Sequence, residues 1–362
     1  MKHLVLLGGG HAHLHVLQAL ARERLPAVRV TLVVPFADVV CSGMVPGVVA
    51  GHYAPADAAV ALAPLAARAG AEFIVQAATH LRAAARSLTL ADGRVLGYDA
   101  ISVDTSAVMD RDRIPGAREH ALFVRPIEHF VRLLQPLLEL AQRRVLRMVV
   151  VGAGATGVEL ALALQHRLGE RAVVSLVTGG TPPLPSYPRQ VRARALRALK
   201  RSGVTLFEDG CREIAAGHLI LGSGARLACD VPLLAIGASA PSWLAESGLA
   251  LDEQGFISIG ATLQSRSHVD VFAAGDATSR SDEAEPRNGV YAVRAGALLA
   301  FNLRRFLAGG ELQQHVPRRP TIDLLSCGDR RAIASWGRWS AEGRWVWRWK
   351  DRIDRAFVAR HR

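Results

Sequence analysis

Two segments of this sequence repeat one pattern, an apolar run that ends in glycines and continues as a helical pattern. The first is LVLLGGG at 4–10 followed by HAHLHVLQALAR, and the second is RMVVVGAGATG at 147–157 followed by VELALALQHRL. Each predicts a strand, a tight turn and a helix. Further apolar runs at 28–34 and 172–177 complete two βαβ units with parallel strands. Two such units predict two doubly wound, Rossmann-like α/β domains.

The chain has 362 residues, which leaves room for two domains and a short C-terminal segment. Three more apolar runs lie at 98–104, 230–238 and 269–278, and each ends in small or acidic residues. The ends of parallel strands are where open α/β sheets bind their ligands. We therefore expect the functional residues to follow these runs and the two glycine loops.

The second glycine loop matches the dinucleotide-binding pattern GxGxxG through Gly152, Gly154 and Gly157. The first glycine makes the tight turn, the second lets a pyrophosphate approach, and the third lets helix and strand pack closely. We predict dinucleotide binding here, with a structural turn as the alternative. Thr178 stands where an acid usually binds the ribose of NAD, so NADH, NADPH and a degenerate empty site all stay open.

The first glycine loop keeps Gly8 and Gly10 but has His13 at the third glycine position. Phosphate capture depends mainly on the first two glycines and the helix N-terminus, and these are present. Val34 and Pro35 replace the usual ribose acid. The bulky His13 must push the helix outward or turn toward Val34–Pro35. We predict the second, which places His13 near the adenosine half of a dinucleotide.

His11, His13 and His15 also raise the question of a metal site. Residues two apart on a helix diverge by about 200°, so only His11 and His15 share a face. No HExxH or CxxC pattern supplies the further ligands that zinc requires. We therefore expect no metal and place His11 at the phosphate.

The order of GGGHAH, YDAISVDTS, GAGATGVELA, VFAAGDAT and GVYAVRAG resembles the FAD-dependent pyridine nucleotide-disulphide oxidoreductase family. SGMVPGVVAGHY and GRWVWRWKDRIDRAF are most similar to the flavoprotein found fused ahead of selenide, water dikinase in some bacteria. Broader relatives are type II NADH dehydrogenases and sulfide:quinone oxidoreductases. The resemblance implies an FAD domain at 1–115 and 240–310, an NAD(P)H domain at 116–239 and a C-terminal segment at 311–362.

Residue by residue, the resemblance implies sites for both cofactors. It places Asp276 at the ribityl and phosphate portion of FAD, and a helix beginning near Gly289–Val290 with its positive end toward the flavin. Glu159 matches an acid that steers the nicotinamide or relays a proton, and a helix glutamate with ordinary contacts is the alternative. The expected cofactor-binding residues are Gly8, Gly10, His11, Ala12, His13, Thr105, Gly275, Asp276, Gly289 and Val290 for FAD, and Gly152, Gly154, Thr156 and Gly157 for NADH or NADPH.

The redox disulfide that the family name implies is not supplied by this sequence. The corresponding region reads VVCSGMVPG, with Cys41 alone and Met44 near the place of a second cysteine. Dithiol chemistry needs an attacking and a resolving thiol. Cys41 stays a candidate redox residue near the flavin, with a small buried thiol as the alternative. The widely spaced cysteines predict a reduced, cytosolic chain.

Much of the net charge of +12 lies in the tail, where ten Lys/Arg face three Asp/Glu between residues 330 and 362. Trp345, Trp349, Ile353, Ala356 and Phe357 fall at helical spacing among these arginines. Such a helix either lies in a membrane interface or packs on the flavin domain, and the sequence supports both hypotheses. We expect no nucleic-acid binding, because no recognition motif accompanies the charge.

These observations predict an FAD-dependent oxidoreductase that passes a hydride from NAD(P)H to flavin and electrons on to a small acceptor. A quinone is the first expectation and a selenium or sulfur compound the second. The competing hypothesis is an FAD-binding redox sensor without turnover. With no targeting segment, we expect a cytoplasmic protein, or one peripheral on the inner face of a membrane. The sequence leaves the oligomeric state, including a homodimer, open.

Overall fold

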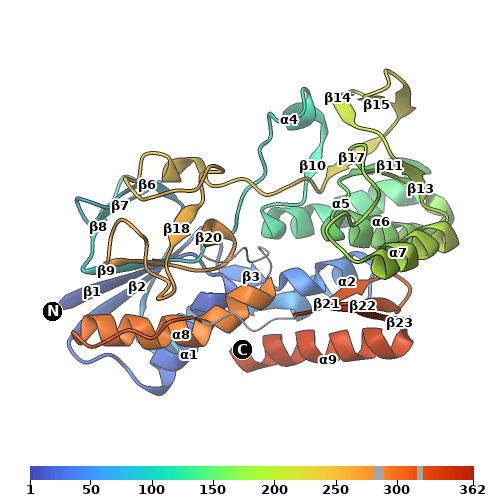
Figure 1. Ribbon diagram of the computed structural model, residues 1–362. Coiled ribbons are helices and arrows are strands. Elements are labelled where there is room, and N and C mark those ends of the chain that lie inside the picture. The colour runs from blue at the N-terminus through green and yellow to red at the C-terminus, as the bar shows by residue number, and fades with distance from the viewer. Residues whose placement is uncertain (281–288, 316–320) are drawn as a thin grey trace.

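The computed structural model describes residues 1–280, 289–315 and 321–362 and confirms the α/β architecture with two parallel sheets (Figure 1). The first sheet has five parallel strands in the order β19-β9-β1-β2-β5. These are Lys2–Leu7 (β1), Val28–Val34 (β2), Glu72–Val75 (β5), Ala100–Val103 (β9) and Val271–Ala273 (β19). Strand β19 lies far along the sequence from the other four strands but pairs with β9. The first sheet is therefore built from two segments that are separated in the sequence by the strands of the second sheet.

The second sheet repeats this arrangement with the order β10-β17-β11-β12-β13, again all parallel. Its central strand β11 and its neighbours are almost continuously apolar and buried, as expected for strands covered on both faces. The strands are Leu122–Phe123 (β10), Leu146–Val151 (β11), Ala172–Val177 (β12), Thr205–Phe207 (β13) and Val231–Leu234 (β17). The predicted strands at 28–34 and 172–177 coincide with β2 and β12.

Helices α1 and α6 begin directly after the two glycine loops, so each presents its positive N-terminus at the end of a central strand. Each five-stranded sheet forms a lobe with the helices that pack on it. In the first lobe, α1 packs between α3 and α8. In the second, α6 packs against β11 and β12 and against α7 and α2. The helices of these two lobes are His11–Arg22 (α1), Val45–Val49 (α2), Leu62–Ala69 (α3), Ala117–His120 (α4), Ile127–Arg143 (α5), Ala155–Leu168 (α6), Arg189–Ser202 (α7) and Gly289–Leu307 (α8).

Smaller sheets extend both lobes, with β6–β8 and β14–β16 as three-stranded antiparallel units. Two further strand pairs are β3–β4, antiparallel, and β18–β20, parallel. Their bounds are Asp38–Val40 (β3), Ala59–Ala61 (β4), Ala78–Arg82 (β6), Ser87–Leu90 (β7), Val95–Gly97 (β8), Cys211–Ala215 (β14), His218–Leu221 (β15), Arg226–Ala228 (β16), Ile257–Ile259 (β18) and Thr278–Arg280 (β20).

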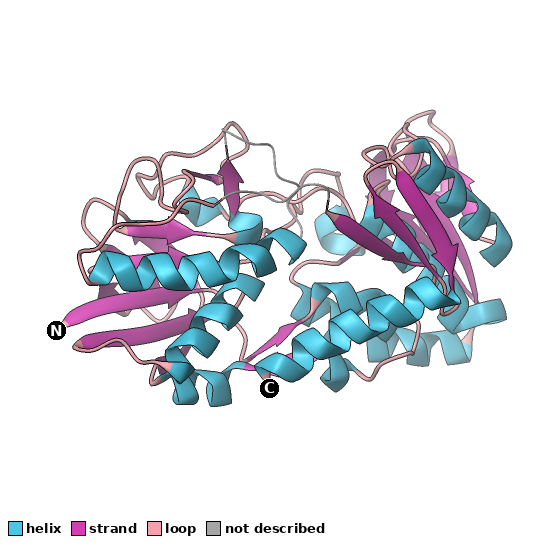
Figure 2. Ribbon diagram, turned by 60° about the horizontal axis from the view of Figure 1, so that its bottom comes forward, coloured by secondary structure: helices cyan, strands magenta, loops and turns pink. Residues whose placement is uncertain are grey.

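The C-terminal segment forms a three-stranded antiparallel sheet, Ile322–Ser326 (β21), Ala332–Trp336 (β22) and Trp339–Gly343 (β23), followed by Arg344–His361 (α9). Helix α9 packs on this sheet and reaches α1 of the first lobe near its own C-terminal end. Figure 2 shows it running from the second lobe toward the helices of the first. The segment therefore joins the two lobes.

The helical period predicted for the tail is confirmed, but most of the aromatic face is on the outside. Trp345, Trp349 and Ile353 are 53%, 39% and 44% exposed. The buried side of α9 instead carries Val346, Lys350, Val358 and His361. Lys350 bonds to the Gly43 carbonyl and to Asp354 of α9 itself, and His361 packs against His15 of α1 and Phe357 of α9. A hydropathy pattern does not show such contacts.

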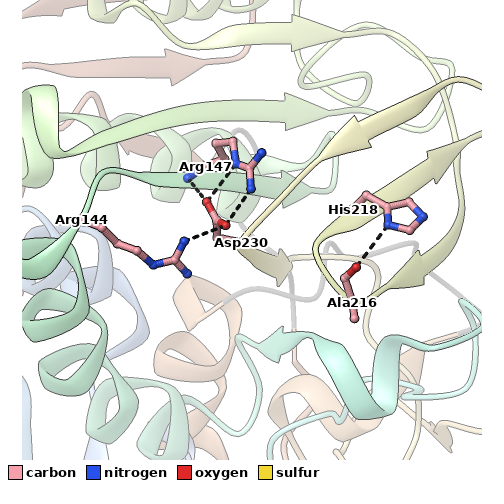
Figure 3. Close-up of polar contacts among 5 residues, drawn as sticks. All are labelled: Arg144, Arg147, Ala216, His218 and Asp230. Atoms are coloured by element: carbon pink, nitrogen blue, oxygen red, sulfur yellow. Dashed lines mark hydrogen bonds and ion pairs between the residues drawn. The ribbon is translucent and has the colours of Figure 1, made fainter.

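A charged cluster fixes the beginning of β11 (Figure 3). Asp230 precedes β17, and its carboxylate accepts the Arg147 backbone N–H at 2.8 Å and the Arg147 Nε at 3.0 Å. Arg144, the residue directly after α5, donates to Asp230 Oδ1 at 3.0 Å. The hydrogen bonds from Arg147 hold the pKa of Asp230 well below its usual range. Helix α5 and the two strands are thus tied together at one point.

None of the helices in the described ranges is both long and apolar enough to cross a membrane.

Candidate active site

In the glycine loop between β11 and α6, Gly157 is closely packed and Gly154 borders open space. A Cβ on Gly157 would overlap the Gly152 carbonyl, so α6 approaches β11 closely because this residue is glycine. Gly154 faces open space. Its loop and the first residues of α6, including Thr156, line a cavity of about 650 Å³. This volume lies in the range of small-molecule sites, and binding of a nicotinamide dinucleotide here stays a prediction.

Thr178 is buried at the end of β12 and lines the same cavity. Its Oγ1 donates to the Phe207 carbonyl at 3.4 Å, and the N–H of the following Gly179 donates to the Asp209 carbonyl at 2.8 Å. These bonds tie the loop after β12 to the end of β13. Thr178 gives the cavity no charge at the position where an acid would bind ribose hydroxyls.

The loop between β1 and α1 differs from its counterpart because Asp104, at the end of β9, fills the space beside it. Gly8 has a φ of +102°, and a Cβ there would overlap the Asp104 carbonyl. A Cβ on Gly10 would overlap the Asp104 carboxylate. Gly8 and Gly10 are therefore required by the packing of β9 against the loop, a role that the sequence pattern did not indicate.

The predicted orientation of His13 toward Val34–Pro35 is wrong. Its ring is completely buried, with Nδ1 at 2.7 Å from the Gly8 carbonyl and Nε2 at 2.8 Å from Ser102 Oγ. Ser102 belongs to β9, on the opposite side of β1 from β2. The imidazole thus occupies the space between helix and strands that a third glycine would close, and it does not face the adenosine side. Its neighbour Ala12 is also fully buried.

His11 is the first residue of α1, and its ring packs against Phe357 of α9 at a centroid distance of 5.0 Å. His15 lies one turn further and packs edge-on against His361 at 4.9 Å. Burial lowers the pKa of His11 and His15 to about 4, so both are neutral at physiological pH. The side chains expected at a phosphate or on a simple helix face instead form the contact between α1 and α9.

A second cavity of about 690 Å³ runs past Gly8–Gly10 and on to Trp243. Val34 and Pro35 line it at the end of β2, where the adenosine half of a dinucleotide lies in this type of fold. Thr105 also lines it, and its buried hydroxyl has no hydrogen-bond partner in the described part of the chain. An unpartnered hydroxyl and a helix N-terminus beside an elongated cavity fit the polar groups of FAD.

Asp276 lies in the short helical turn Gly275–Ala277 (η5) and pairs with Arg125. The Arg125 Nη1 is 2.6 Å from Asp276 Oδ2, and both side chains are mostly buried. Arg125 lies just before α5, so this ion pair connects the second lobe to the first. The described part of α8 begins at Gly289, where the sequence predicts a helix. The side chains at Gly289–Val290 lie outside the described residues, and their approach to a flavin stays a prediction.

Glu159 of α6 and Lys350 of α9 belong to a buried charged cluster. The Glu159 Oε1 accepts the Ser326 backbone N–H at 2.7 Å. The Lys350 Nζ donates to the Gly43 carbonyl and, at 2.6 Å, to Asp354 Oδ2. Burial raises the pKa of Glu159 to about 7, although the Lys350 charge opposes this. Glu159 is therefore poised to hold or release a proton near neutral pH.

Cys41 lies beside this cluster, but its environment does not support a nucleophilic role. The side chain is buried, and burial raises the pKa of its thiol to about 12. A thiol with this pKa is protonated at neutral pH, whereas the thiolate is the reactive form. Cys41, Cys211, Cys229 and Cys327 are all unpaired. The burial favours the alternative of a small buried thiol, and a redox role of Cys41 stays a prediction.

Across the described ranges, no three His, Cys, Asp or Glu side chains are arranged to hold a metal ion.

Comparison with known proteins assigns the family. The model of the pyridine nucleotide-disulphide oxidoreductases matches residues 2–296. The chain belongs to this family. Its members bind FAD and NAD(P)H. These two cofactors are therefore the candidate ligands of the two glycine-lined cavities.

The chain is also similar to two proteins named as quinone reductases. It is 27% identical to demethylphylloquinone reductase NdbB of Synechocystis sp., over 66% of this chain and 61% of that protein. It is also 27% identical to the internal alternative NAD(P)H-ubiquinone oxidoreductase A1 of Arabidopsis thaliana, over 59% of this chain and 48% of that protein. The matched region thus spans less than two thirds of the first relative and about half of the second.

Two solved structures share the fold of the chain. The sulfide:quinone oxidoreductase of Aquifex aeolicus superposes with a TM-score of 0.82 at 18% identity, covering 100% of this chain and 92% of that one. The NDH2 of Plasmodium falciparum, in complex with NADH, gives a TM-score of 0.83 at 12% identity, covering 99% and 97%.

Sequence reasoning missed Lys350, Asp354 and Arg125 as parts of the site. Lys350 and Asp354 are four apart on α9 and form an i,i+4 ion pair, a signal that the sequence does contain. Their burial next to Glu159 depends on the C-terminal sheet, which was not predicted. Arg125 precedes a proline and carries no motif, so only the fold brings it to Asp276.

Proposed function

We propose that this flavoprotein oxidises NADH or NADPH and passes the electrons to a quinone. The observation that carries the proposal is the meeting of the two glycine-lined cavities, since Met109 lines both of them. Two dinucleotides bound in these cavities would be neighbours, as hydride transfer between them requires. When bound, FAD supplies the centre that accepts a hydride and releases electrons one or two at a time.

The residues of the chain then have distinct roles. Gly152–Gly157 and the N-terminus of α6 would hold the pyrophosphate of the nicotinamide cofactor. Gly8–Gly10, Thr105 and Asp276 would hold FAD, and Arg125 fixes the Asp276 carboxylate through the ion pair. The N-terminus of α8 would stabilise negative charge on the reduced flavin.

A quinone is favoured as acceptor by the relatives named as quinone reductases and by the cluster of Glu159 and Lys350. Reduction of a quinone to a quinol consumes two protons. Glu159, partly buried and with a pKa of about 7, and the buried Lys350 ammonium are groups that can hold a proton at neutral pH. A selenium or sulfur compound remains the alternative acceptor, in line with the finer resemblance to the flavoprotein fused to selenide, water dikinase.

A comparison of the rates at which three acceptors reoxidise the flavin tests this proposal. The holoprotein is reduced without oxygen and mixed in parallel with a soluble quinone, selenite and polysulfide, while the return of flavin absorbance is followed. We expect the quinone to react fastest. Glu159→Gln is expected to slow this step by about 10²-fold or more and to remove an inflection near pH 7, above which the wild-type rate falls. Glu170→Gln, which changes an exposed acid just after α6, is the matched control. Faster reaction with selenite or polysulfide would contradict the assignment.

We also propose that the outer face of the C-terminal segment binds an anionic membrane surface. Trp336, Trp339, Trp345, Trp349 and Ile353 are exposed there. Exposed tryptophans among arginines are typical of interfacial helices. We expect the holoprotein to float with vesicles that contain anionic lipid and not with neutral vesicles, and the double substitution Trp345→Ser and Trp349→Ser to reduce flotation. Unchanged flotation of a folded double variant would overturn this proposal.

A further inference from the structure

A buried carboxylate occupies the N-terminal end of α1, beside the cavity that runs past Gly8–Gly10. Asp104 is 2% exposed, and its Oδ2 accepts the His13 backbone N–H at 2.8 Å. Its carbonyl accepts the Gly10 N–H at 3.0 Å. Gly10 and Gly275 make room for the carboxylate, because a Cβ on either would overlap it. Asp104 is therefore enclosed by the loop, by α1 and by η5.

This carboxylate competes with a phosphate for one helix end. The first turn of an α-helix offers a small number of free N–H groups, which attract a negative charge. Asp104 takes those of Ala12 and His13. A pyrophosphate bound at the same end would use the His11 N–H and lie within one helical turn of a buried carboxylate. Two negative groups at that separation, away from water, repel each other strongly.

The surrounding charges do not relieve this repulsion. Asp276 of η5 raises the pKa of Asp104 further, after burial, which is the main cause and brings it to about 7. Arg125 is engaged by Asp276 at 2.6 Å. From α1, the His11 and His13 side chains have pKa values near 4 and are neutral. In the described part of the chain, no cation is hydrogen-bonded to Asp104. A proton on Asp104 would cancel its charge and add an O–H donor.

We propose that binding of FAD is coupled to the uptake of one proton by Asp104, which makes Asp104 a positioning residue for the pyrophosphate. The inference rests on the placement of the FAD pyrophosphate at α1 proposed above. The neutral acid keeps an acceptor oxygen for the α1 N–H groups and removes the like-charge contact. By linkage, the affinity for FAD then falls as the pH rises.

Calorimetric titration of the apoprotein with FAD tests this coupling directly. Repeating the titration in two buffers of different ionisation enthalpy gives the number of protons taken up. We expect one proton per FAD at about pH 8, and an affinity that falls about tenfold for each pH unit above about 7. Asp104→Asn, which is isosteric, is expected to bind FAD without proton uptake and without this slope. Asp112→Asn, an exposed acid on the rim of the same cavity, is expected to keep both.

Wild-type binding with no proton uptake, or an unchanged slope in Asp104→Asn, would overturn the inference. If Asp104→Asn does not fold, the proton count of the wild type decides the question alone. Failure of the wild type to bind FAD at any pH would overturn the cofactor placement as well, and is thereby distinguishable from a failure of the coupling.

Discussion

At the scale of single residues, His13 shows how an imidazole can replace the glycine that usually lets helix and strand meet. Both ring nitrogens are hydrogen-bonded, to the Gly8 carbonyl at 2.7 Å and to Ser102 Oγ at 2.8 Å. Burial lowers its pKa to about 4, so the neutral ring is the form that the core accepts. The side chain stabilises the junction of β1, β9 and α1. It does not line the cavity, which is lined at this loop by Gly8–Gly10.

We predict that His13→Ala lowers the free energy of unfolding by about 2–4 kcal/mol, because it leaves a cavity and removes the partner of Ser102. Urea unfolding measures this, with the exposed His80→Ala as control, expected within about 0.5 kcal/mol of wild type. Between the ordinary pKa of 6.5 and about 4, the unfolded chain binds more protons. Wild-type stability should therefore fall as the pH drops through this window, and less steeply in the variant. An alanine variant as stable as the wild type would contradict this packing.

The two glycine loops also show what sequence can predict at this scale. The strand, turn and helix of each unit follow from local pattern, because apolar runs, glycines and helical period are all within a few residues. The orientation of His13 depends on Ser102, which is 89 positions away and whose strand pairs beside β1 only in the folded sheet. The role of Asp104 escaped the pattern for the same reason.

At the scale of elements, the Asp230 cluster joins α5, β11 and the start of β17. Asp230→Ala is expected to lower the free energy of unfolding by about 1–3 kcal/mol, since several charge-assisted hydrogen bonds to a buried carboxylate are lost. Its pKa lies below the ordinary 3.8, so this contribution is present above pH 3.8 and is lost as the pH falls below it. Asp112→Ala, at an exposed pair with Arg118, is the control, and its effect on the free energy of unfolding is expected to be clearly smaller. Equal effects of the two substitutions in urea unfolding would argue against the cluster.

For α9, the periodicity of the sequence predicts the helix but not which of its faces is buried. Its helical period was predictable from Trp345, Trp349 and Ile353, but the helix turns Lys350 and His361 inward. Lys350 is accepted there because Gly43 and Asp354 satisfy its ammonium, and His361 because Phe357 and His15 surround its ring. Pairing of buried polar groups is a tertiary property, so hydropathy alone ranks the wrong face as the inner one.

At the scale of the whole molecule, Met109 lines two cavities, which we propose hold the two dinucleotides. The Arg125–Asp276 pair and α9 join the lobes that carry these cavities. Anaerobic stopped-flow mixing of the FAD-loaded protein with NADH, and separately with NADPH, tests this most directly. We predict that at least one of them bleaches the flavin absorbance within seconds and that added quinone restores it. If neither nicotinamide bleaches the flavin at millimolar concentration, the two cavities do not cooperate in hydride transfer and the proposed function is wrong.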